Sequence, residues 1–321
     1  MISIVIPLFN KAHSIERTLK SIFAQTYTKF EIIIINDGST DNGIEVITKF
    51  TTDPRVKIIT QENQGVSAAR NMGVLSSKYT YIAFLDGDDE WLPEYLTKMV
   101  QAIEMFPSAG MFCCAGIVRN ADGTKNIRIA NKYKNQILEI NFFENPHVFL
   151  HTSATIVSKK QFNHTAGFPV GMKRNQDFAL FFSLALITQV IYCGIPLSIY
   201  VGGIEGQTTS VSMNGNIFIL QHVVNRYNIV NTVWENTPFK NKYYKLFLKY
   251  ELRHTIITQL RESDFKSIHF LFENLDKKIT KLFTGVEIYI YREPKLKWIG
   301  IVFILATKLR WRLRGFPIVG K

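Results

Sequence analysis

Four acidic side chains, at positions 86, 88, 89 and 90, follow an apolar run within residues 83–91. Acids that crowd the end of a buried strand repel one another unless a positive charge lies between them. Oxygen ligands suit Mg²⁺ or Mn²⁺, and a cation held by one or two carboxylates completes its shell with substrate phosphates. The segment therefore indicates a site for a divalent cation and a nucleotide-bearing substrate. The same residues also allow a solvated acidic turn in which Asp89 caps a helix that starts near Pro93.

The apolar segments upstream of this cluster predict a parallel sheet. Buried-strand runs occur over residues 2–10, 30–35 and 56–59, and a polar turn follows each run. Between the first two runs, apolar positions recur at helical spacing over residues 15–23, and Ser14 is a candidate cap. Strands that are apolar on both faces and alternate with helices form parallel sheets that are covered on both sides. Ligands of such sheets bind beyond the carboxyl ends of the strands, which is where the polar turns lie.

The chain resembles family 2 glycosyltransferases of GT-A fold through motifs that occur in family order and at about family spacing. The motifs are Ser3-Ile4-Val5-Ile6-Pro7-Leu8-Phe9-Asn10, Asn36-Asp37-Gly38-Ser39-Thr40-Asp41, Asn63 with Gly65-Val66-Ser67-Ala68-Ala69-Arg70-Asn71-Met72-Gly73, and Phe84-Leu85-Asp86-Gly87-Asp88-Asp89. The resemblance is dense over about residues 1–95 and thinner to about residue 210. It implies an α/β fold with a Rossmann-like, mostly parallel central sheet flanked by helices.

The resemblance also implies roles for residues that would bind a nucleotide-sugar donor. Pro7 and Phe9 would line the pocket of the base, and the carboxylate of Asp37 would accept a hydrogen bond from the base. Arg70 would lie near the phosphates, to which a guanidinium offers charge-assisted donors, or would hold the acidic loop. Two structural alternatives stay open. Arg70 would only pair with an acid beneath the sheet, or Asp37 would only cap the helix after Asp41.

In the Asp86-Gly87-Asp88 element, the resemblance places Asp86 at the ribose or the metal. Gly87 belongs to the same donor-binding element, and Asp88 would hold the Mn²⁺ or Mg²⁺ that bridges the diphosphate.

Inverting sugar transfer also needs a base that takes the proton from the acceptor hydroxyl, and a carboxylate within hydrogen-bond reach can do this. The candidate base is Asp177, which opens an apolar helix after the turn at residues 167–169. The family has Glu-Asp at this place after a Gly-Gly-Phe turn, whereas this chain has Gln176 and a single glycine. The alternative is that Asp177 is a helix N-cap.

Two further segments lie around the candidate base. Residues 148–157 predict another strand, which resembles the family segment that forms the acceptor wall. His151 in this run is either a structural residue or part of the site. Residues 202–210 are rich in glycine and predict a mobile lid or acceptor loop.

The net charge of +12 comes largely from residues beyond 236, where Lys and Arg alternate with aromatic side chains. This mixture suits an anionic bilayer, near which each Lys or Arg contributes about 1 kcal/mol. The apolar stretch at residues 298–306 is shorter than the roughly 20 residues of a spanning helix, so it predicts an interfacial anchor. A solvated charged face on a small helical subdomain is the alternative. Nucleic acid is not expected, because neither an RNA-binding aromatic signature nor a zinc pattern accompanies the charge.

Length and composition predict how the chain is organised. Its 321 residues, 46% of them hydrophobic, allow one sizeable core and a smaller appended unit. We expect a catalytic domain over residues 1–210, with a nucleotide-sugar half at 1–95 and an acceptor half at 96–210. A helical, basic region would occupy residues 211–321. The three cysteines do not make a disulfide framework, and the sequence begins with its first strand rather than a signal segment. We therefore expect a cytoplasmic protein at the inner face of the cell membrane.

These features predict a metal-dependent inverting transferase that passes a sugar from a nucleotide diphosphate, UDP by preference, to a hydroxyl. The expected acceptor is a glycan or a lipid-linked glycan in surface polysaccharide synthesis. Two alternatives remain. A sugar nucleotidyltransferase would have a glycine-rich basic loop after the first strand, which the turn at residues 7–11 lacks. A membrane-bound scaffold that has lost turnover is the other, and Gln176 is the residue in its favour.

Overall fold

The computed structural model describes residues 1–144, 146–202, 216–238 and 240–313, without the side chain of residue 312. The chain divides into two compact units. The first comprises Met1–Ile140 and Val148–Val211, and the second comprises Asn141–His147 and Ser212–Lys321.

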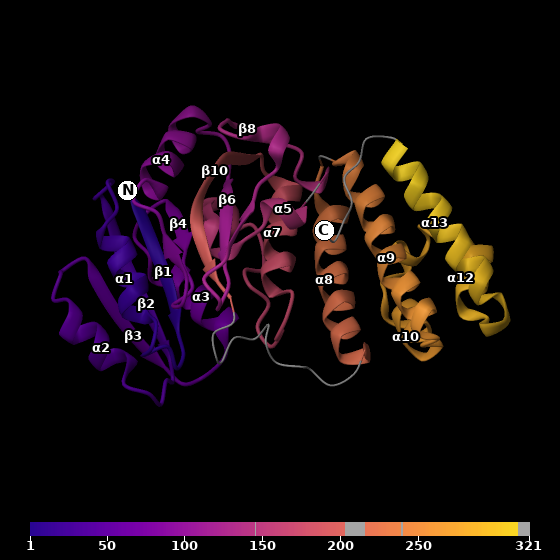
Figure 1. The fold of residues 1–321 in the computed structure, drawn as a ribbon, viewed down its shortest axis with the longest axis horizontal. Helices are drawn as coiled ribbons and strands as arrows, with labels where there is room; N and C mark the ends of the chain where they lie inside the picture. Colours follow the sequence, from indigo (N-terminus) through magenta and orange to yellow (C-terminus); the bar gives the residue numbers. More distant parts are fainter. Residues whose placement is uncertain (145, 203–215, 239, 314–321) are drawn as a thin grey trace. The chain divides into compact units, whose positions relative to one another are not determined.

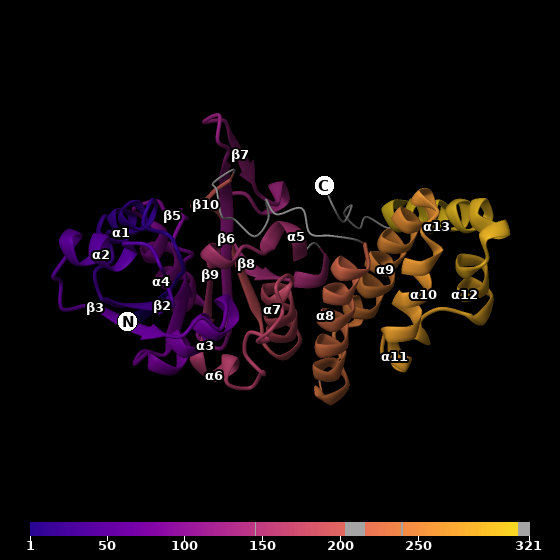
Figure 2. The same cartoon turned by 90° about the horizontal axis from the view of Figure 1, so that it is seen from below.

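A ten-stranded mixed sheet forms the centre of the first unit (Figure 1). The strands are β1 (Ile2–Leu8), β2 (Phe30–Asp37), β3 (Val56–Gln61), β4 (Tyr81–Phe84), β5 (Glu90–Trp91), β6 (Met111–Arg119), β7 (Lys125–Arg128), β8 (Ile137–Ile140), β9 (Thr155–Ser158) and β10 (Val190–Val201). Their order is β3-β2-β1-β4-β9-β6-β10-β5, with β7 on β6 and β8 on β10. The strands β3, β2, β1 and β4 pair in parallel, as do β6 and β10, whereas β9 is antiparallel to both of its neighbours. Figure 2 shows the β6–β7 hairpin projecting from the sheet.

Helices cover both faces of this sheet. They are α1 (Ile15–Phe23), α2 (Gly43–Phe50), α3 (Val66–Ser76), α4 (Tyr95–Met105), α6 (Lys159–Phe162) and α7 (Gln176–Ile187), with the short helices η1 (Asn131–Tyr133) and η3 (Thr152–Ala154). Side chains alternate between the faces of a strand. Ile4 and Ile32 accordingly lie in the core that includes α1, α2 and α4, whereas Ile33 and Ile35 pack on Ala69 of α3. The strands β1 and β2 are buried at every position because helices cover both faces, and the predicted α/β fold with a sheet flanked by helices is confirmed.

Gly73 lets α3 lie directly on β1. A Cβ atom at this position would overlap Cγ1 of Val5. The close approach fixes the height of α3 on the sheet and therefore the position of Arg70, one turn earlier on the same helix.

The predicted strand over residues 148–157 is wrong for most of its length. The short helix α5 (Pro146–Phe149) and η3 precede β9, which begins only at Thr155. A backbone bond from Ala154 N to the carbonyl of His151 (2.9 Å) and a bond from Thr155 Oγ1 to the same carbonyl (2.8 Å) close a turn here. Hydroxyl groups that bond to nearby backbone in this way compete with strand formation.

Every described element of the second unit is helical, which confirms the predicted helical C-terminal region. The elements are η2 (Phe142–Glu144), α8 (Asn216–Asn236), α9 (Lys242–Glu262), α10 (Phe265–Asn274), α11 (Lys277–Thr280), α12 (Gly285–Arg292), η4 (Pro294–Leu296) and α13 (Lys297–Leu313). Buried charges in this unit are paired: Glu251 contacts Arg226 (3.2 Å) and His147 (3.1 Å). Within the described residues, no helix combines the length and the apolar content that crossing a bilayer requires.

Candidate active site

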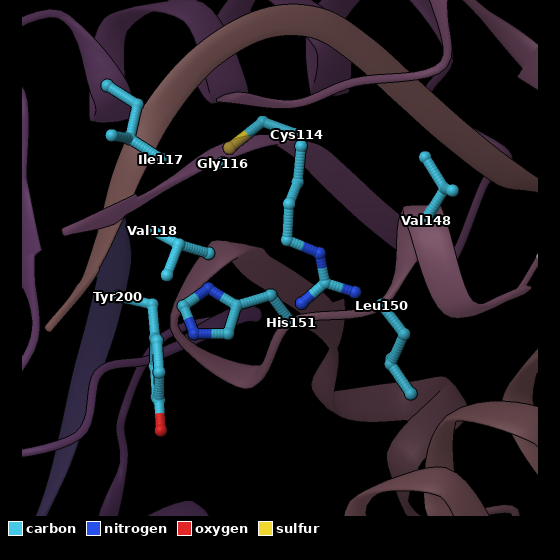
Figure 3. A pocket seen from close by; sticks show the side chains of 9 residues that line it. Cys114, Gly116, Ile117, Val118, Val148, Leu150, His151 and Tyr200 are labelled. Atoms are coloured by element: carbon cyan, nitrogen blue, oxygen red, sulfur yellow. The ribbon is translucent and has the colours of Figure 1, made fainter. Parts of the chain in front are cut away.

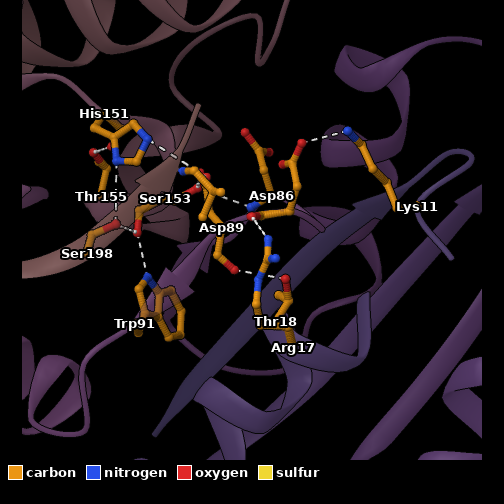
Figure 4. Close-up of polar contacts among 12 residues, drawn as sticks. Lys11, Arg17, Thr18, Asp86, Asp89, Trp91, His151, Ser153, Thr155 and Ser198 are labelled. Atoms are coloured by element: carbon orange, nitrogen blue, oxygen red, sulfur yellow. Dashed lines mark hydrogen bonds and ion pairs between the residues drawn. The ribbon is translucent and has the colours of Figure 1, made fainter. Parts of the chain in front are cut away.

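The loop between β4 and β5 carries the acidic residues, and basic side chains from two other segments hold two of them. Arg70 on α3 donates from Nη2 to Oδ1 of Asp86 at 2.6 Å. Lys11, in the turn after β1, donates from Nζ to Oδ2 of Asp88 at 2.6 Å (Figure 4). The repulsion expected between the carboxylates is therefore relieved partly by the protein's own cations.

Asp89 is the buried anchor of this loop, with only 1% of the residue exposed. Its Oδ2 accepts from Ser153 Oγ at 2.5 Å and lies 3.4 Å from Nε2 of His151, while its Oδ1 accepts from the Val201 amide at 3.2 Å (Figure 4). Burial raises the pKa of Asp89, and the bond to His151 partly opposes that rise. The alternative in which Asp89 caps the next helix is wrong, because Glu94 is the N-cap residue of α4.

Helix α1 fixes the backbone of the acidic loop through three consecutive carbonyl groups. Ser14 Oγ donates to the carbonyl of Gly87 (2.8 Å), Arg17 Nη2 to that of Asp88 (3.0 Å) and Thr18 Oγ1 to that of Asp89 (2.8 Å). Ser14 is at the predicted N-cap position of α1, but its hydroxyl donates a hydrogen bond to the loop and does not cap the helix. These three hydrogen bonds hold the backbone of the loop against α1.

Asp37 shapes the turn that leads into α3. Its Oδ1 accepts from Gln61 Nε2 (2.7 Å) and the Gln64 amide (2.9 Å), and its Oδ2 accepts from the Gly65 amide (2.8 Å). Asn42 is the N-cap residue of α2, so the alternative in which Asp37 caps the helix after Asp41 is wrong.

The two residues expected near a nucleotide base differ in exposure. Pro7 is buried in β1, whereas Phe9 just beyond the strand is 45% exposed. Asn10 follows with a left-handed backbone (φ 51°), and its Oδ1 accepts from the Thr40 amide at 2.8 Å. This hydrogen bond joins the turns after β1 and β2, and the neighbouring ring of Phe9 is exposed to solvent.

Arg70 is almost fully buried, at 4% exposure, and its guanidinium lies 5.1 Å from the ring centroid of Phe168. Among the described residues its Nε and Nη1 have no hydrogen-bond partner. Arg70 therefore does hold the acidic loop, one of the two roles expected for it, and it retains donors suited to anionic oxygens.

Asn71 ties the turn before α7 to helix α3. Its Nδ2 donates to the Phe168 carbonyl (2.8 Å), and its Oδ1 accepts from the Phe168 amide (2.9 Å). The Phe168 ring packs edge-on against Phe84 and Phe181, with centroid separations of 5.1 and 5.9 Å. This clamp positions the start of α7 against the strand that ends in the acidic loop.

Asp177 lies in the first turn of α7 and is partly exposed. Burial raises the pKa of its carboxyl group, the positive charge of Arg70 opposes this rise, and the negative charge of Asp86 adds to it. The charges of Arg70 and Asp86 therefore both act on the carboxyl group of Asp177. Asn175, not Asp177, is the N-cap residue of α7, so the alternative of a plain N-cap is wrong.

The residues present fit a divalent cation held jointly with a substrate. Among the described residues, Arg70 and Lys11 bond to only one oxygen each of Asp86 and Asp88, which leaves the second oxygen of each carboxylate for a cation. No group of three or more acidic, His or Cys side chains in the described part of the chain could hold a metal alone. Two carboxylates suit Mg²⁺ or Mn²⁺ that completes its shell with phosphate oxygens.

A small cavity of about 10 Å³, room for roughly one water molecule, lies beside the buried His151 network (Figure 3). Its lining includes His151, Arg128, Tyr200 and Leu150. His151 lies between Asp89 and Ser198, whose Oγ is 3.4 Å from its Nδ1, so the structural reading of this histidine is supported. The predicted lid at residues 202–210 falls outside the described residues after Gly202.

Sequence reasoning missed Lys11 and the contacts from α1, although both follow the first motif directly. Lys11 and Asp88 are separated by 77 positions, and only the fold brings them together.

Comparison with known proteins identifies the family of the chain. The profile of the family described as "Glycosyl transferase family 2" matches residues 3–164, just over half of the chain. An uncharacterized glycosyltransferase of Escherichia coli (strain K12), YibD, is 43% identical over 105 residues, which are 32% of this chain and 30% of that protein. An uncharacterized glycosyltransferase of Rickettsia felis is 25% identical over 295 residues, 88% of this chain and 45% of that protein. The matched stretches thus span less than half the length of these curated relatives.

Solved structures share the fold at low sequence identity. S. aureus TarS 1-349 in complex with UDP-GlcNAc matches with a TM-score of 0.71 and 13% identity, covering 98% of this chain and 92% of that one. The mannosyltransferase PcManGT from Pyrobaculum calidifontis, in complex with GDP-Man and Mn²⁺, matches with a TM-score of 0.60 and 15% identity over 96% of this chain and 86% of that one. With the family profile over half its length, the chain belongs to glycosyl transferase family 2 and has a GT-A-like fold.

Proposed function

We propose that this chain is a metal-dependent, inverting glycosyltransferase that uses a nucleotide-diphosphate sugar, UDP-linked by preference, as its donor. The observation that carries the proposal is the ion pair between Arg70 and Asp86, together with the effect of both charges on the carboxyl group of Asp177. This reaction needs two kinds of carboxylate. One kind holds the cation, and the other, with a raised pKa, accepts the proton of the acceptor hydroxyl. Residues 1–95 would bind the donor and residues 96–210 the acceptor.

Donor binding would involve the carboxyl ends of the first two strands. The exposed ring of Phe9 would contact the base beside Pro7, and Asp37 would accept from the base. Gly87 lies between the two carboxylates of the cation site, and a Cβ there would face the backbone of Pro7 at 3.5 Å. The free donors of Arg70 would bind phosphate oxygens.

The cation would be Mn²⁺ or Mg²⁺, held by Asp88 and Asp86. When bound, it would supply positive charge to the diphosphate leaving group. PcManGT, of similar fold, was solved with GDP-Man and Mn²⁺, and TarS with UDP-GlcNAc, which supports a nucleotide-sugar donor here.

Asp177 would act as the base. Its carboxylate accepts the proton of an acceptor hydroxyl while that oxygen forms a bond to the anomeric carbon. The bond from this carbon to the diphosphate breaks at the opposite face, and its electron pair leaves with the diphosphate. Partial burial raises the pKa of Asp177 and so makes it a stronger base than an exposed aspartate.

The acceptor would be a hydroxyl of a glycan or lipid-linked glycan in surface polysaccharide synthesis, at the inner, anionic face of the cell membrane. The basic C-terminal region supports this placement, since the net charge of +12 favours an anionic surface.

Calorimetric titration tests the donor site. UDP- and GDP-sugars are titrated into the wild type and Asp88→Asn, each with and without Mn²⁺, and the exposed Asp122→Asn serves as the control. We expect Mn²⁺-dependent binding to the wild type and the control, and at least a tenfold loss in Asp88→Asn. Equal binding with and without Mn²⁺ by all three proteins would refute the cation site.

A further inference from the structure

Helix α13 is apolar on two opposite faces, and only one of them is covered. Its inner face packs on α9, where Ile301 and Ile304 are buried and Trp311 stacks on Tyr250 at a centroid separation of 4.7 Å. Gly300 permits the contact, because a Cβ there would lie 3.2 Å from Leu260 Cδ1. This face explains why the helix folds onto the second unit.

The opposite side, here called the outer face, consists of large apolar side chains that are 43% to 81% exposed: Trp298, Val302, Leu305, Leu309 and Leu313. Their spacing of three or four residues puts them within an arc of about 80° on one side of the helix. The neighbouring helix α12 adds two more exposed apolar residues, Val286 and Tyr289. A helix that is apolar all round is ordinarily buried, and contiguous exposed apolar surface marks a binding site.

The basic residues near the outer face indicate that its partner is anionic. Residues 294–321 contain seven Lys and Arg and no acid. By the helical period, Lys297 and Lys308 lie on one side of the outer face, where their Nζ atoms contact Ser263 Oγ and His254 Nδ1, both at 2.8 Å, and the exposed Arg310 lies on the other side. A second copy would bring these like charges together, which is unfavourable, whereas anionic headgroups complement them.

Residue types along the outer face also match a bilayer interface. Trp298 opens the helix, and its indole ring suits the headgroup level. A helix with an apolar face and flanking Lys and Arg lies in the plane of the interface. Because no described helix can span a bilayer, a parallel orientation is the one that buries this face.

We propose that the outer face of α13 docks on an anionic lipid bilayer with α13 parallel to the membrane plane. The inference specifies a surface of the second unit. It rests on the membrane placement in the proposed function. Because it is tested by lipid binding, a negative result would remove that placement and leave the proposal of sugar transfer standing.

The test is co-sedimentation of the full chain with vesicles of phosphatidylglycerol and phosphatidylcholine, or of phosphatidylcholine alone. The variant Val302→Glu/Leu309→Glu places two acids on the outer face. The matched control, Leu75→Glu/Met105→Glu, adds the same charge at exposed apolar positions of the first unit. Circular dichroism and thermal unfolding establish that both variants are folded.

We expect the wild type and the control to pellet with anionic vesicles, and the outer-face variant to bind at least about tenfold more weakly. Weak binding of the wild type to phosphatidylcholine alone supports the role of charge. The proposal is overturned if the wild type stays in the supernatant, binds both vesicle types equally, or binds no better than the folded outer-face variant. It is also overturned if sedimentation velocity shows a dimer that only the outer-face substitutions dissociate, since a second copy would then cover this face.

Discussion

Lys11 and Asp88 form a tight ion pair, with 2.6 Å between Nζ and Oδ2, although 77 positions separate them. Both side chains are largely buried, and the carboxylate is the one proposed to hold the cation. An ammonium group and a divalent cation therefore compete for the negative charge of Asp88.

Replacing Lys11 by Met should strengthen the binding of Mn²⁺ in the absence of donor. The change removes the competing positive charge, and we expect a gain of about 1 kcal/mol in the free energy of Mn²⁺ binding, or about fivefold in affinity. Titration of Mn²⁺ followed by electron paramagnetic resonance measures it. Lys49→Met, which breaks an exposed helical pair with Glu45, is the control and should change nothing. Unchanged or weaker Mn²⁺ binding in Lys11→Met would show that the two cations do not compete.

Asp177→Asn should lower the turnover number by roughly 10²- to 10⁴-fold, the usual contribution of a general base. Donor affinity should stay nearly the same, because Asp177 is assigned to the acceptor hydroxyl. Steady-state kinetics with calorimetric donor binding separates the two quantities, and Asp53→Asn serves as the control. Wild-type turnover in Asp177→Asn would remove this residue as the base.

The pH dependence of turnover provides a second test of the base. Burial raises the pKa of Asp177 above the ordinary aspartate value. The carboxylate form is the active one, so turnover should be complete above this raised pKa and fall as the pH drops through it. Rates are measured as a function of pH at saturating donor and Mn²⁺. If the fall in rate at low pH reflects protonation of residue 177, Asp177→Glu should shift the pH at which this fall occurs. If the low-pH fall in rate occurs at the same pH in Asp177→Glu, a different group is responsible for it.

Asn71→Ala should destabilise the first unit, because it removes both hydrogen bonds to the Phe168 backbone. Leaving these buried backbone groups unpaired costs about 1–3 kcal/mol in the free energy of unfolding. Denaturant unfolding measures the loss. The control is Asn120→Ala, whose exposed bond to Thr124 should contribute less than about 0.5 kcal/mol. Equal stabilities of the two variants would mean that the turn is held by its aromatic contacts alone.

Local patterns predicted the first three strands, β1, β2 and β3. The runs at Ile2–Leu8 and Phe30–Asp37 are apolar on both faces because helices cover both sides, and this information is present within each segment. The motif residues Arg70, Asp86 and Asp177 could be located because their segments resemble family motifs.

The errors and omissions have a common physical cause, which is that tertiary contacts decide them. Thr155 lies in an apolar run, but its hydroxyl bonds to His151 and helps close a turn that delays β9. Ser14 stands at a helix start, yet its hydroxyl binds the Gly87 carbonyl. Neither partner is visible from the periodicity of the segment.

The products of the reaction show whether this site transfers a sugar. The wild type, Asp88→Asn and Asp122→Asn are incubated with UDP- and GDP-sugars, a glycan acceptor and Mn²⁺, and the phosphate products are separated by chromatography. The account predicts nucleoside diphosphate from the wild type and the control, dependent on Mn²⁺, and almost none from Asp88→Asn. Pyrophosphate would instead indicate synthesis of a donor, and donor binding without any product would indicate a scaffold; either result would contradict sugar transfer by this site.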